Sequence, residues 1–477
     1  MTALVELAYL LAAAFFILGL KRLASPATAR NGNRLASLGM LIAVVVTLLD
    51  QRIVGFAGIM IGLVVGGLAG AVLARTIRMT AMPQMVALLN GFGGAASVLV
   101  AGAEFLRLSA EGGSTPDVAV SVQFSILIGA VTFSGSLIAF GKLQELVTGQ
   151  PVTYPLQKPL NAVLLLAILA TASYLVASDA GLPATAALSG VFGEGVLTPL
   201  ALLVVLSLVL GVLSVIPIGG ADMPVVISLL NSYSGIAAAS TGFVIDNDGL
   251  IISGALVGAS GIILTQIMCK AMNRSLGNVL FGAFGAAAPE GAVSVAGAEG
   301  GTVRQVSPED AAIVLAYARE AVIVPGYGLA VSQAQHAVRE LANLLEARGV
   351  NVRYAIHPVA GRMPGHMNVL LAEADVPYDQ LWEMERINPD FERTDVVLVI
   401  GANDVVNPAA RSNPSSPIYG MPILDVDRAQ QVIVMKRSMN FGFAGIDNEL
   451  FYHPNTSMLF GDAKASLNRL IAEVKEA

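Results

Sequence analysis

Long apolar segments recur through the first 270 residues of the chain and then stop. Most of them reach the roughly 20 residues that a helix needs to cross about 30 Å of hydrocarbon. The second segment is short, and the seventh and eighth nearly run together, so eight or ten spans also fit the pattern. The pattern predicts a transmembrane helical domain over residues 1–275, with about nine spans. These lie at 3–20, 35–49, 53–74, 85–106, 119–140, 159–177, 196–217, 223–244 and 249–269.

From residue 307 the pattern changes to short apolar runs that alternate with amphipathic stretches. Ser307 followed by Pro308 and two acids is a typical helix start. Strands alternating with helices predict an α/β Rossmann-like domain over 307–477, with a mostly parallel, doubly wound sheet. Residues 276–306 are the predicted linker, rich in Gly and Ala. We expect strands at 321–326, 351–358, 396–401 and 432–438, helices at 328–348 and 379–388, and a terminal helix from Asp462 after 458–461.

Composition supports this division and excludes several classes of protein. Only 13% of the 477 residues are charged, against about 25% in ordinary soluble domains. The single Cys269 excludes a disulfide framework and a multi-cysteine iron–sulfur site within this chain. A net charge of −7 gives no footprint for nucleic acid. Since Glu6 comes early and no cleavage site follows, we interpret 3–20 as a retained span.

Basic residues in the loops predict the orientation in the membrane. With the N-terminus outside, the inner loops hold nearly all Lys and Arg residues of the membrane part. The outer loops hold most of its acidic residues. An odd number of spans then puts the C-terminal domain in the cytoplasm. The inner residues are Lys21, Arg22, Arg30, Arg34, Arg75, Arg78, Lys142, Lys158, Lys270 and Arg274.

Small residues recur at helical spacing within the predicted spans. Such faces let membrane helices approach closely, so we expect ordinary bundle packing at these positions. The glycines are Gly62, Gly66, Gly70, Gly91, Gly93, Gly94, Gly254 and Gly258.

A glycine-rich turn separates a predicted strand from a predicted helix at Gly326-x-Gly328-x-x-Val331. The first glycine permits a tight turn, the second lets the backbone approach a pyrophosphate, and the helix N-terminus faces the anion. Val331 replaces the usual third small residue. The Gly-Tyr-Gly string also occurs in potassium filters, but here it lies in the soluble part. We interpret the turn as a dinucleotide site.

The charges around this turn indicate which dinucleotide is bound. An NAD site normally carries an acid at the end of the second strand, where this chain has His357 and Pro358. Lys436, Arg437 and Ser438 end another strand and suit a 2′-phosphate, although a solvated strand end is an equally simple interpretation.

Three loops add candidate contacts. Asp404 follows a strand within Gly401–Asp404, where it is either a titratable group beside a cofactor or a helix cap. The loops 361–365 and 442–445 are glycine-rich.

Polar residues within the predicted spans are few, and ionisable groups there are functional candidates. Asp222 stands out, because it lies between the seventh and eighth spans; its simpler role is that of an N-cap. The others are Glu6, Asn90, Glu104, Asn231 and Tyr233, and all four histidines lie in the C-terminal part.

With both halves considered, the chain closely resembles the beta subunits of proton-translocating NAD(P) transhydrogenases over nearly its full length. The segments that carry the resemblance are 219–235, 267–275, 325–335, 356–374, 397–410, 436–445 and 458–466.

The resemblance implies that the C-terminal domain binds NADP(H), in an orientation reversed from the ordinary one. It implies direct hydride transfer, without a catalytic acid or base, from NAD(H) bound to a partner alpha subunit, coupled to inward proton translocation. Proton-coupling positions would be Asp222, Asn231, Asp404 and Asn90. Cofactor contacts would be Gly326, Tyr327, Gly328, Ala330, Val331, Ala360, Gly361, Arg362, Met363, Pro364, Gly401, Asn403, Asp404, Lys436, Arg437, Ser438, Gly442, Phe443, Gly445, Gly461 and Asp462.

The same resemblance implies a dimer of alpha–beta protomers, surrounded by lipid in the bacterial inner membrane, with no metal and no nucleic acid. Two departures from the family pattern stand out. Asn90 occupies a position where many relatives have a histidine, and Asn cannot exchange a proton near neutral pH. We hypothesise that a histidine of the alpha chain carries the proton here. Phe443 replaces a tyrosine of relatives, so a hydroxyl contact there is absent.

Two other classes of function predict different features. A channel or transporter with a nucleotide-sensing Rossmann domain predicts an acid after the second strand and a filter among broken helices. A quinone-linked reductase needs ligands for haem or iron–sulfur clusters. The sequence has none of these features in the expected places.

Overall fold

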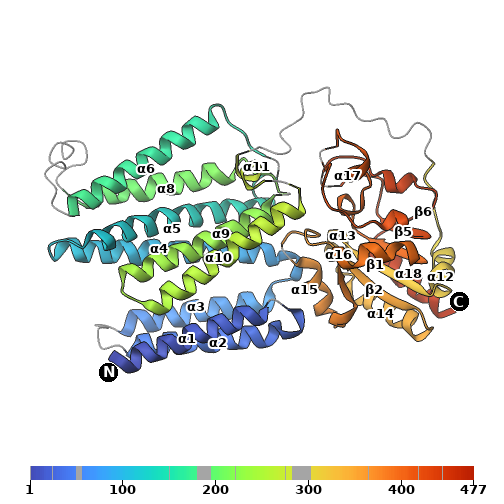
Figure 1. Cartoon of the computed structure of the whole chain (residues 1–477), viewed down its shortest axis with the longest axis horizontal. Helices are drawn as coiled ribbons and strands as arrows, with labels where there is room; N and C mark the ends of the chain where they lie inside the picture. The colour runs from blue at the N-terminus through green and yellow to red at the C-terminus, as the bar shows by residue number, and fades with distance from the viewer. Residues whose placement is uncertain are drawn as a thin grey trace. The chain divides into compact units, whose positions relative to one another are not determined.

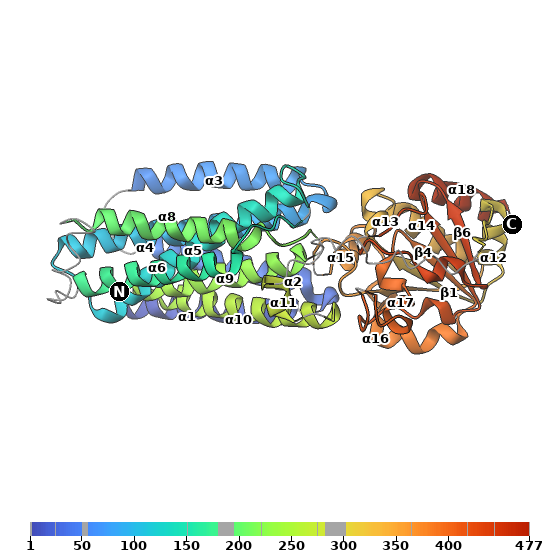
Figure 2. The ribbon, with the colours of Figure 1, turned by 90° about the horizontal axis from the view of Figure 1, so that it is seen from above.

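The computed structural model describes residues 2–23, 25–49, 56–149, 151–179, 195–220, 222–273, 275–281, 302–363, 365–416, 418–442 and 444–476. The chain forms two compact units. The first comprises Met1–Thr265 together with Leu280–Phe284, and the second comprises Gln266–Val279 together with Gly285–Ala477. Each unit is described by itself. Figures 1 and 2 show a bundle of long helices in the first and a sheet with surrounding helices in the second.

Nine helices of the described residues are long and apolar enough to cross a membrane. This confirms the predicted membrane bundle. Helix α2 begins at Pro26, before the start of the predicted apolar run. Proline is well tolerated in the first turn of a helix. The helices are α1 (Thr2–Leu23), α2 (Pro26–Leu49), α3 (Phe56–Thr76), α4 (Met82–Ala110), α5 (Pro116–Leu143), α6 (Gln157–Asp179), α8 (Leu197–Val215), α9 (Met223–Val244) and α10 (Asp248–Ala271); short pieces are η1 (Met79–Ala81) and α11 (Leu276–Phe281).

Glycines bring several of these helices into backbone contact. A Cβ on Gly94 of α4 would lie 2.5 Å from the carbonyl oxygen of Gly129 on α5. Gly254 and Gly258 of α10 meet Gly235 of α9 in the same way. Close approach of this kind replaces the hydrophobic driving force that lipid removes. The expectation of packing through small residues therefore holds for these helices.

Helix α3 is different. A Cβ added at its glycines, Gly62, Gly66 and Gly70 included, would meet nothing within 4 Å among the described residues. Its described residues include no buried one. Among the described residues, these glycines therefore pack against no neighbouring helix, since four-residue spacing reveals a smooth face and not what covers it.

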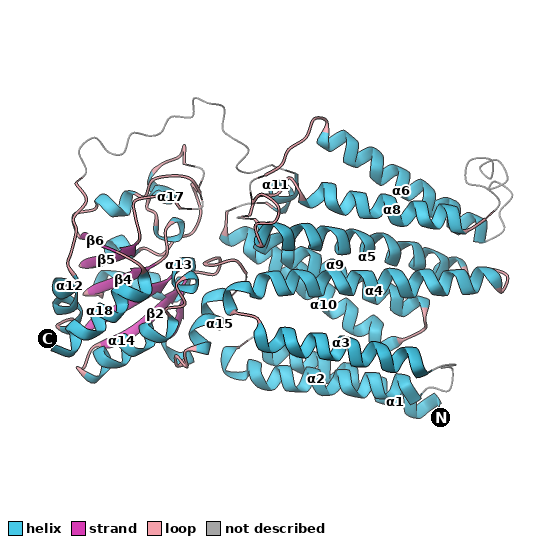
Figure 3. Cartoon of the chain, turned by 180° about the vertical axis from the view of Figure 1, so that it is seen from behind, coloured by secondary structure: helices cyan, strands magenta, loops and turns pink. Residues whose placement is uncertain are grey.

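The C-terminal unit contains a six-stranded sheet in the order β3-β2-β1-β4-β5-β6, with every strand pair parallel. This confirms the predicted doubly wound sheet, in which β1 and β4 flank the point where strand order reverses. The strands, magenta in Figure 3, are β1 (Glu320–Pro325), β2 (Asn351–Ile356), β3 (Leu381–Glu383), β4 (Val396–Ile400), β5 (Gln431–Lys436) and β6 (Thr456–Phe460).

Helices and short 3-10 turns connect and cover the sheet, and α12 and α14 both pack against α18. The helices are α12 (Pro308–Ala316), α13 (Tyr327–Val331), α14 (Gln335–Ala347), α15 (His366–Glu373), α16 (Met384–Ile387), α17 (Ala409–Ser412) and α18 (Ala463–Glu476), with 3-10 turns η3 (Tyr378–Gln380), η4 (Asn388–Arg393), η5 (Asp404–Val406), η6 (Val426–Arg428) and η7 (Glu449–Tyr452).

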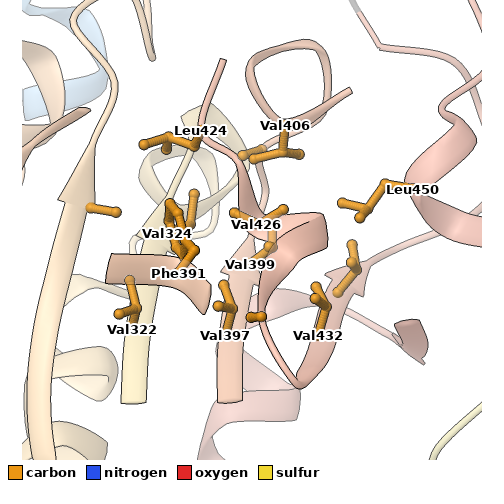
Figure 4. Close-up of a cluster of buried hydrophobic side chains, with 14 of the residues drawn as sticks. Val322, Val324, Phe391, Val397, Val399, Val406, Leu424, Val426, Val432 and Leu450 are labelled. Carbon is orange, nitrogen blue, oxygen red and sulfur yellow. The ribbon is translucent and has the colours of Figure 1, made fainter. Parts of the chain in front are cut away.

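A buried aliphatic cluster covers one face of the sheet (Figure 4). Alternate residues of β1, β4 and β5 point into it, as the two-residue period of a strand requires. Val406 of η5 and Leu450 of η7 join the same cluster from the loops that follow the strands. These loops are therefore fixed by the core.

Two predicted helices differ from the observed elements. The expected helix 328–348 is two helices, α13 and α14, because Gln333 adopts a left-handed conformation with φ of 48°. The expected helix 379–388 contains strand β3, which pairs with the end of β2. A three-residue edge strand gives too short an alternation to be recognised from the sequence.

Candidate functional site

The candidate site lies at the carboxyl edge of the parallel sheet. Because all strands run the same way, the segments that follow them emerge at one edge, where open α/β sheets bind ligands. The segments that follow β1, β2, β4, β5 and β6 therefore lie at this carboxyl edge. These segments contain the candidate site residues predicted from the sequence.

Three glycines bring the loops after β1 and β4 into contact. The backbone amide of Gly328 donates to the carbonyl oxygen of Gly401 at 3.0 Å. A Cβ on Gly328 would lie 2.7 Å from Cα of Gly401, and one on Gly326 would overlap the Gly401 backbone. Gly401 has φ of 66°, which favours glycine. The glycine pattern therefore serves the close approach of these two loops.

The loop after β2 meets the turn after β1 through aromatic contacts. The Arg362 guanidinium lies 4.6 Å from the centre of the Tyr327 ring, and that ring is 6.0 Å from His366. Nδ1 of His366 accepts a hydrogen bond from the Arg362 amide at 3.0 Å. Gly361, with φ of 108°, leaves room for the imidazole. Ala330 is buried, whereas Val331 is exposed.

His357 directly follows β2 without adding charge. Its Nε2 lies 2.9 Å from the carbonyl oxygen of Pro422, and its Nδ1 accepts from the Val359 amide at 3.3 Å. Burial lowers the pKa of His357 to about 4, against a smaller opposing effect of the Pro422 hydrogen bond. The imidazole is therefore neutral at physiological pH, and His357 provides neither an acid nor a cation at this position.

Positive charge gathers at the end of β5. The Lys436 ammonium donates to the carbonyl oxygen of Asn440 at 2.5 Å and lies 4.6 Å from the Phe451 ring centre. Burial lowers the pKa of Lys436, while the charges of Asp447 and Asp404 oppose this shift. Arg437 and Ser438 follow on the exposed surface. This arrangement offers a planar cation and a hydroxyl to an anionic ligand.

Asp404 is attached to the segment 437–445, here called the β5 loop. Its Oδ2 accepts from the Ala444 amide at 2.9 Å. The cap of η5 is Asn403, so the alternative of Asp404 as a helix cap is wrong. A Cβ on Gly442 would overlap the Asn403 side chain and lie 2.6 Å from Oδ1 of Asp404. Glycine at this position thus lets the β5 loop lie against the loop after β4.

A buried asparagine that the sequence analysis missed supports Asn403. Nδ2 of Asn448 donates to both the backbone and the side-chain oxygen of Asn403, each at 3.0 Å. Its Oδ1 caps η7 by accepting from the Leu450 amide. Nearby, Tyr452 donates to Oδ2 of Asp447 at 2.8 Å. Asn followed by Glu indicates a cap in the sequence, but the contact with Asn403 depends on tertiary structure.

The segment after β6 starts the terminal helix. Oδ1 of Asp462 accepts from the amides of Lys464 and Ala465, and its Oδ2 lies 3.4 Å from Ser332 Oγ after α13. Gly461 has φ of 152° and Gly445 has φ of 69°.

The remaining predicted site residues belong to other loops. Ala360 is buried and Met363 half-buried in the loop after β2. Pro364 and Phe443 lie outside the described residues.

In the helical unit, three of the predicted proton-coupling residues lie on or beside α9. Asn90 of α4 is buried and its Nδ2 donates to the carbonyl oxygen of Ile227 on α9 at 3.2 Å. Asp222 is 1% exposed and occupies the N-cap position of α9, as the simpler interpretation expects, although its side chain makes no capping hydrogen bond there. Asn231 lies further along α9 and is half-buried.

Comparison with known proteins gives one consistent result. The family model described as NAD(P) transhydrogenase beta subunit matches residues 5–473. A curated NAD(P) transhydrogenase subunit beta from Rhodospirillum rubrum is similar to this chain, with 51% identity over 471 residues that cover 97% of each chain. The subunit of the same name from a defined strain of that species matches with the same values.

Proposed function

Because the chain belongs to the NAD(P) transhydrogenase beta subunit family, we propose that its C-terminal unit binds NADP(H) and its helical unit translocates protons. The observation that carries this proposal is the edge of the sheet. At this edge, the glycine-rich turns lie at the point where strand order reverses. Lys436, Arg437 and Ser438 lie at the same edge. The chain is an integral membrane protein with at least the nine described apolar helices.

The donors at this edge fit NADP(H). A 2′-phosphate takes a bidentate cation and a hydroxyl, and the strand end where NAD sites carry an acid has the neutral His357. Lys436 and Arg437 would hold the 2′-phosphate, and the turn at Gly326 and Gly328 would face the pyrophosphate. The residues proposed to bind the 2′-phosphate lie at the end of β5 and not after β2, which supports the reversed cofactor orientation.

When bound, the nicotinamide supplies the hydride chemistry. The tasks of this chain are to hold that ring, exclude water and change its affinity for the cofactor with protonation. Asp404 is suited to the last task, since its carboxylate accepts the Ala444 amide of the β5 loop. Protonation would weaken this contact and release the β5 loop.

The second nucleotide belongs to a partner. NAD(H) would bind to an alpha subunit, and hydride would pass from NADH to NADP⁺ as protons move inward. Polar residues along α9, Asp222 and Asn231, with Asn90 beside them, would line the proton path. The assembly would be a dimer of alpha–beta protomers in a bacterial inner membrane, with the C-terminal unit in the cytoplasm.

Nucleotide binding to the full chain in detergent tests the site. We expect tight binding of NADPH and negligible binding of NADH. Arg437→Ala should weaken NADPH binding about 10- to 100-fold, because a charge-assisted hydrogen bond contributes about 1.5–3 kcal/mol. Arg393→Ala is the matched control, since this arginine is exposed and precedes β4 at the opposite edge. Equal affinities for the two nucleotides would contradict the proposal.

A further inference from the structure

Lys142 is a buried lysine of the helical unit that the proposed function does not use. It lies in the last turn of α5 and is 3% exposed. A lysine near the end of a membrane helix usually extends its ammonium group toward water. Here Nζ donates inward, to the carbonyl oxygens of Ile216 at 2.6 Å and Ile218 at 2.8 Å.

The Ile216 carbonyl oxygen lies at the end of a second helix, and that of Ile218 lies in the turn that follows. Helix α8 ends at Val215, and Ile216 is its C-cap. The last carbonyls of a helix have no partners within it and form the negative end of its dipole. Lys142 also occupies the last turn of its own helix, so its ammonium group is favoured by two helix ends. This compensates part of the cost of burying a charge.

The contacts of Lys142 hold the α8–α9 turn, defined as residues 216–220 with Asp222, against α5. The Gly220 amide donates to the carbonyl oxygen of Gly149 at 2.9 Å, and the Val152 amide donates to that of Ile216 at 3.3 Å. Both Gly149 and Val152 belong to the segment that follows α5. The turn is thus fixed by the end of α5 and by the chain beyond it.

The same turn leads directly into Asp222. The Asp222 amide donates to the carbonyl oxygen of Gly219 at 3.1 Å, and its own carbonyl oxygen accepts from Val226 in the first turn of α9. Five residues after Asp222, Ile227 accepts the hydrogen bond of Asn90. A continuous set of hydrogen bonds thus joins Lys142 to the turn and the turn to Asp222 at the start of α9.

We propose that Lys142 is a positioning residue for proton coupling, which holds the α8–α9 turn so that Asp222 keeps a fixed place at the start of α9. This inference rests on the proposed function. Lys142 acts through the turn, and it lies in the helical unit, whereas the proposed nucleotide site lies in the C-terminal unit. Its loss should therefore impair the reaction that requires proton movement and spare the hydride step.

The test uses the complex of this chain with its alpha subunit in proteoliposomes. Lys142→Met keeps the length of the side chain and removes its charge and donors. Net reduction of NADP⁺ by NADH, with proton movement, should fall at least tenfold. Hydride exchange between NADH and an oxidised NAD analogue through permanently bound NADP(H) should stay within twofold. Lys142→Arg should restore coupling, and Lys158→Met, at an exposed lysine of α6, should change neither reaction.

Other outcomes decide against the inference. If both reactions fall together in Lys142→Met, or neither falls, Lys142 does not position the coupling group. If Lys142→Met and Lys142→Gln both fail to assemble while Lys142→Arg assembles, the lysine merely maintains the fold and the inference is wrong. Failure of the proposed function is recognised separately, because the unaltered complex would then show no hydride exchange through NADP(H).

Discussion

At the scale of single residues, burial lowers the pKa of two basic groups in the C-terminal unit. His357 follows β2 and Lys436 is the last residue of β5, both at the edge of the candidate site. His357 is fully enclosed and hydrogen-bonded as a neutral ring, whereas Lys436 is half-buried beside two acids that oppose the effect of burial on its pKa. Burial lowers the pKa of both groups, and the neighbouring acids oppose that shift at Lys436.

The pKa of His357 predicts a stability that depends on pH. Its folded pKa of about 4 lies below the unfolded value of 6.5. Its neutral form therefore favours folding above pH 6.5, and this contribution is lost as pH falls toward 4. The loss should be about 3 kcal/mol between pH 7.5 and pH 4. Denaturant unfolding of the full chain should show a smaller pH dependence in His357→Gln than in the unaltered chain.

The matched control for this titration is His453→Gln, because His453 is exposed. This variant should keep the pH dependence of the unaltered chain. The role assigned to His357 is contradicted if the two variants have equal slopes of unfolding free energy against pH.

At the scale of elements, glycines perform two different tasks. In the sheet domain, Gly326, Gly328 and Gly401 let two loops meet at the strand reversal. In the bundle, Gly94 and Gly129 let α4 and α5 meet, whereas Gly66 of α3 meets nothing within 4 Å among the described residues. The same residue type at similar spacing therefore has different consequences, which depend on the neighbouring element.

A matched pair of substitutions tests this difference. Gly94→Ala should destabilise the bundle by about 1–3 kcal/mol, because the added Cβ meets backbone that cannot move freely. Gly66→Ala should be neutral or stabilise by up to about 1 kcal/mol, because Ala favours a helix over Gly. Unfolding of the full chain in mixed detergent micelles measures both. A loss in Gly66→Ala equal to that in Gly94→Ala would refute the assignment.

At the scale of the whole molecule, the proposed function divides its parts between two chains. This chain would hold NADP(H) and part of the proton path, while the alpha subunit would hold NAD(H). Asn90 lies beside α9 and donates one hydrogen bond to Ile227, but an amide cannot carry a proton near neutral pH. A titrating group from the partner would complete the path.

Proton uptake into proteoliposomes tests this division. Asn90→Ala in the alpha–beta complex should retain pumping within about twofold, because only one hydrogen bond to Ile227 is lost. Substitution of the membrane histidine of the alpha chain should abolish pumping. The opposite pair of results, with pumping lost in Asn90→Ala and kept in the alpha-chain variant, would refute the hypothesis.

The sequence by itself determined the two classes of structure, because each has a periodic signature of its own. Twenty-residue apolar runs can only satisfy their backbone in a membrane as helices. Short apolar runs between amphipathic helices predict a parallel sheet, and this order alone brings the segments after the strands to one edge. The glycine turn at Gly326 and the cations at the end of β5 belong to these segments.

Tertiary structure alone decided which of these residues meet. The contact of Asn448 with Asn403, the link from Asp404 to Ala444 and the hydrogen bonds from Lys142 to the end of α8 join residues that are distant in sequence. It also decided that α3 packs its glycines against none of the described residues and that His357 is neutral. Periodicity records which face of an element is apolar, whereas partners and charge states depend on what that face encloses.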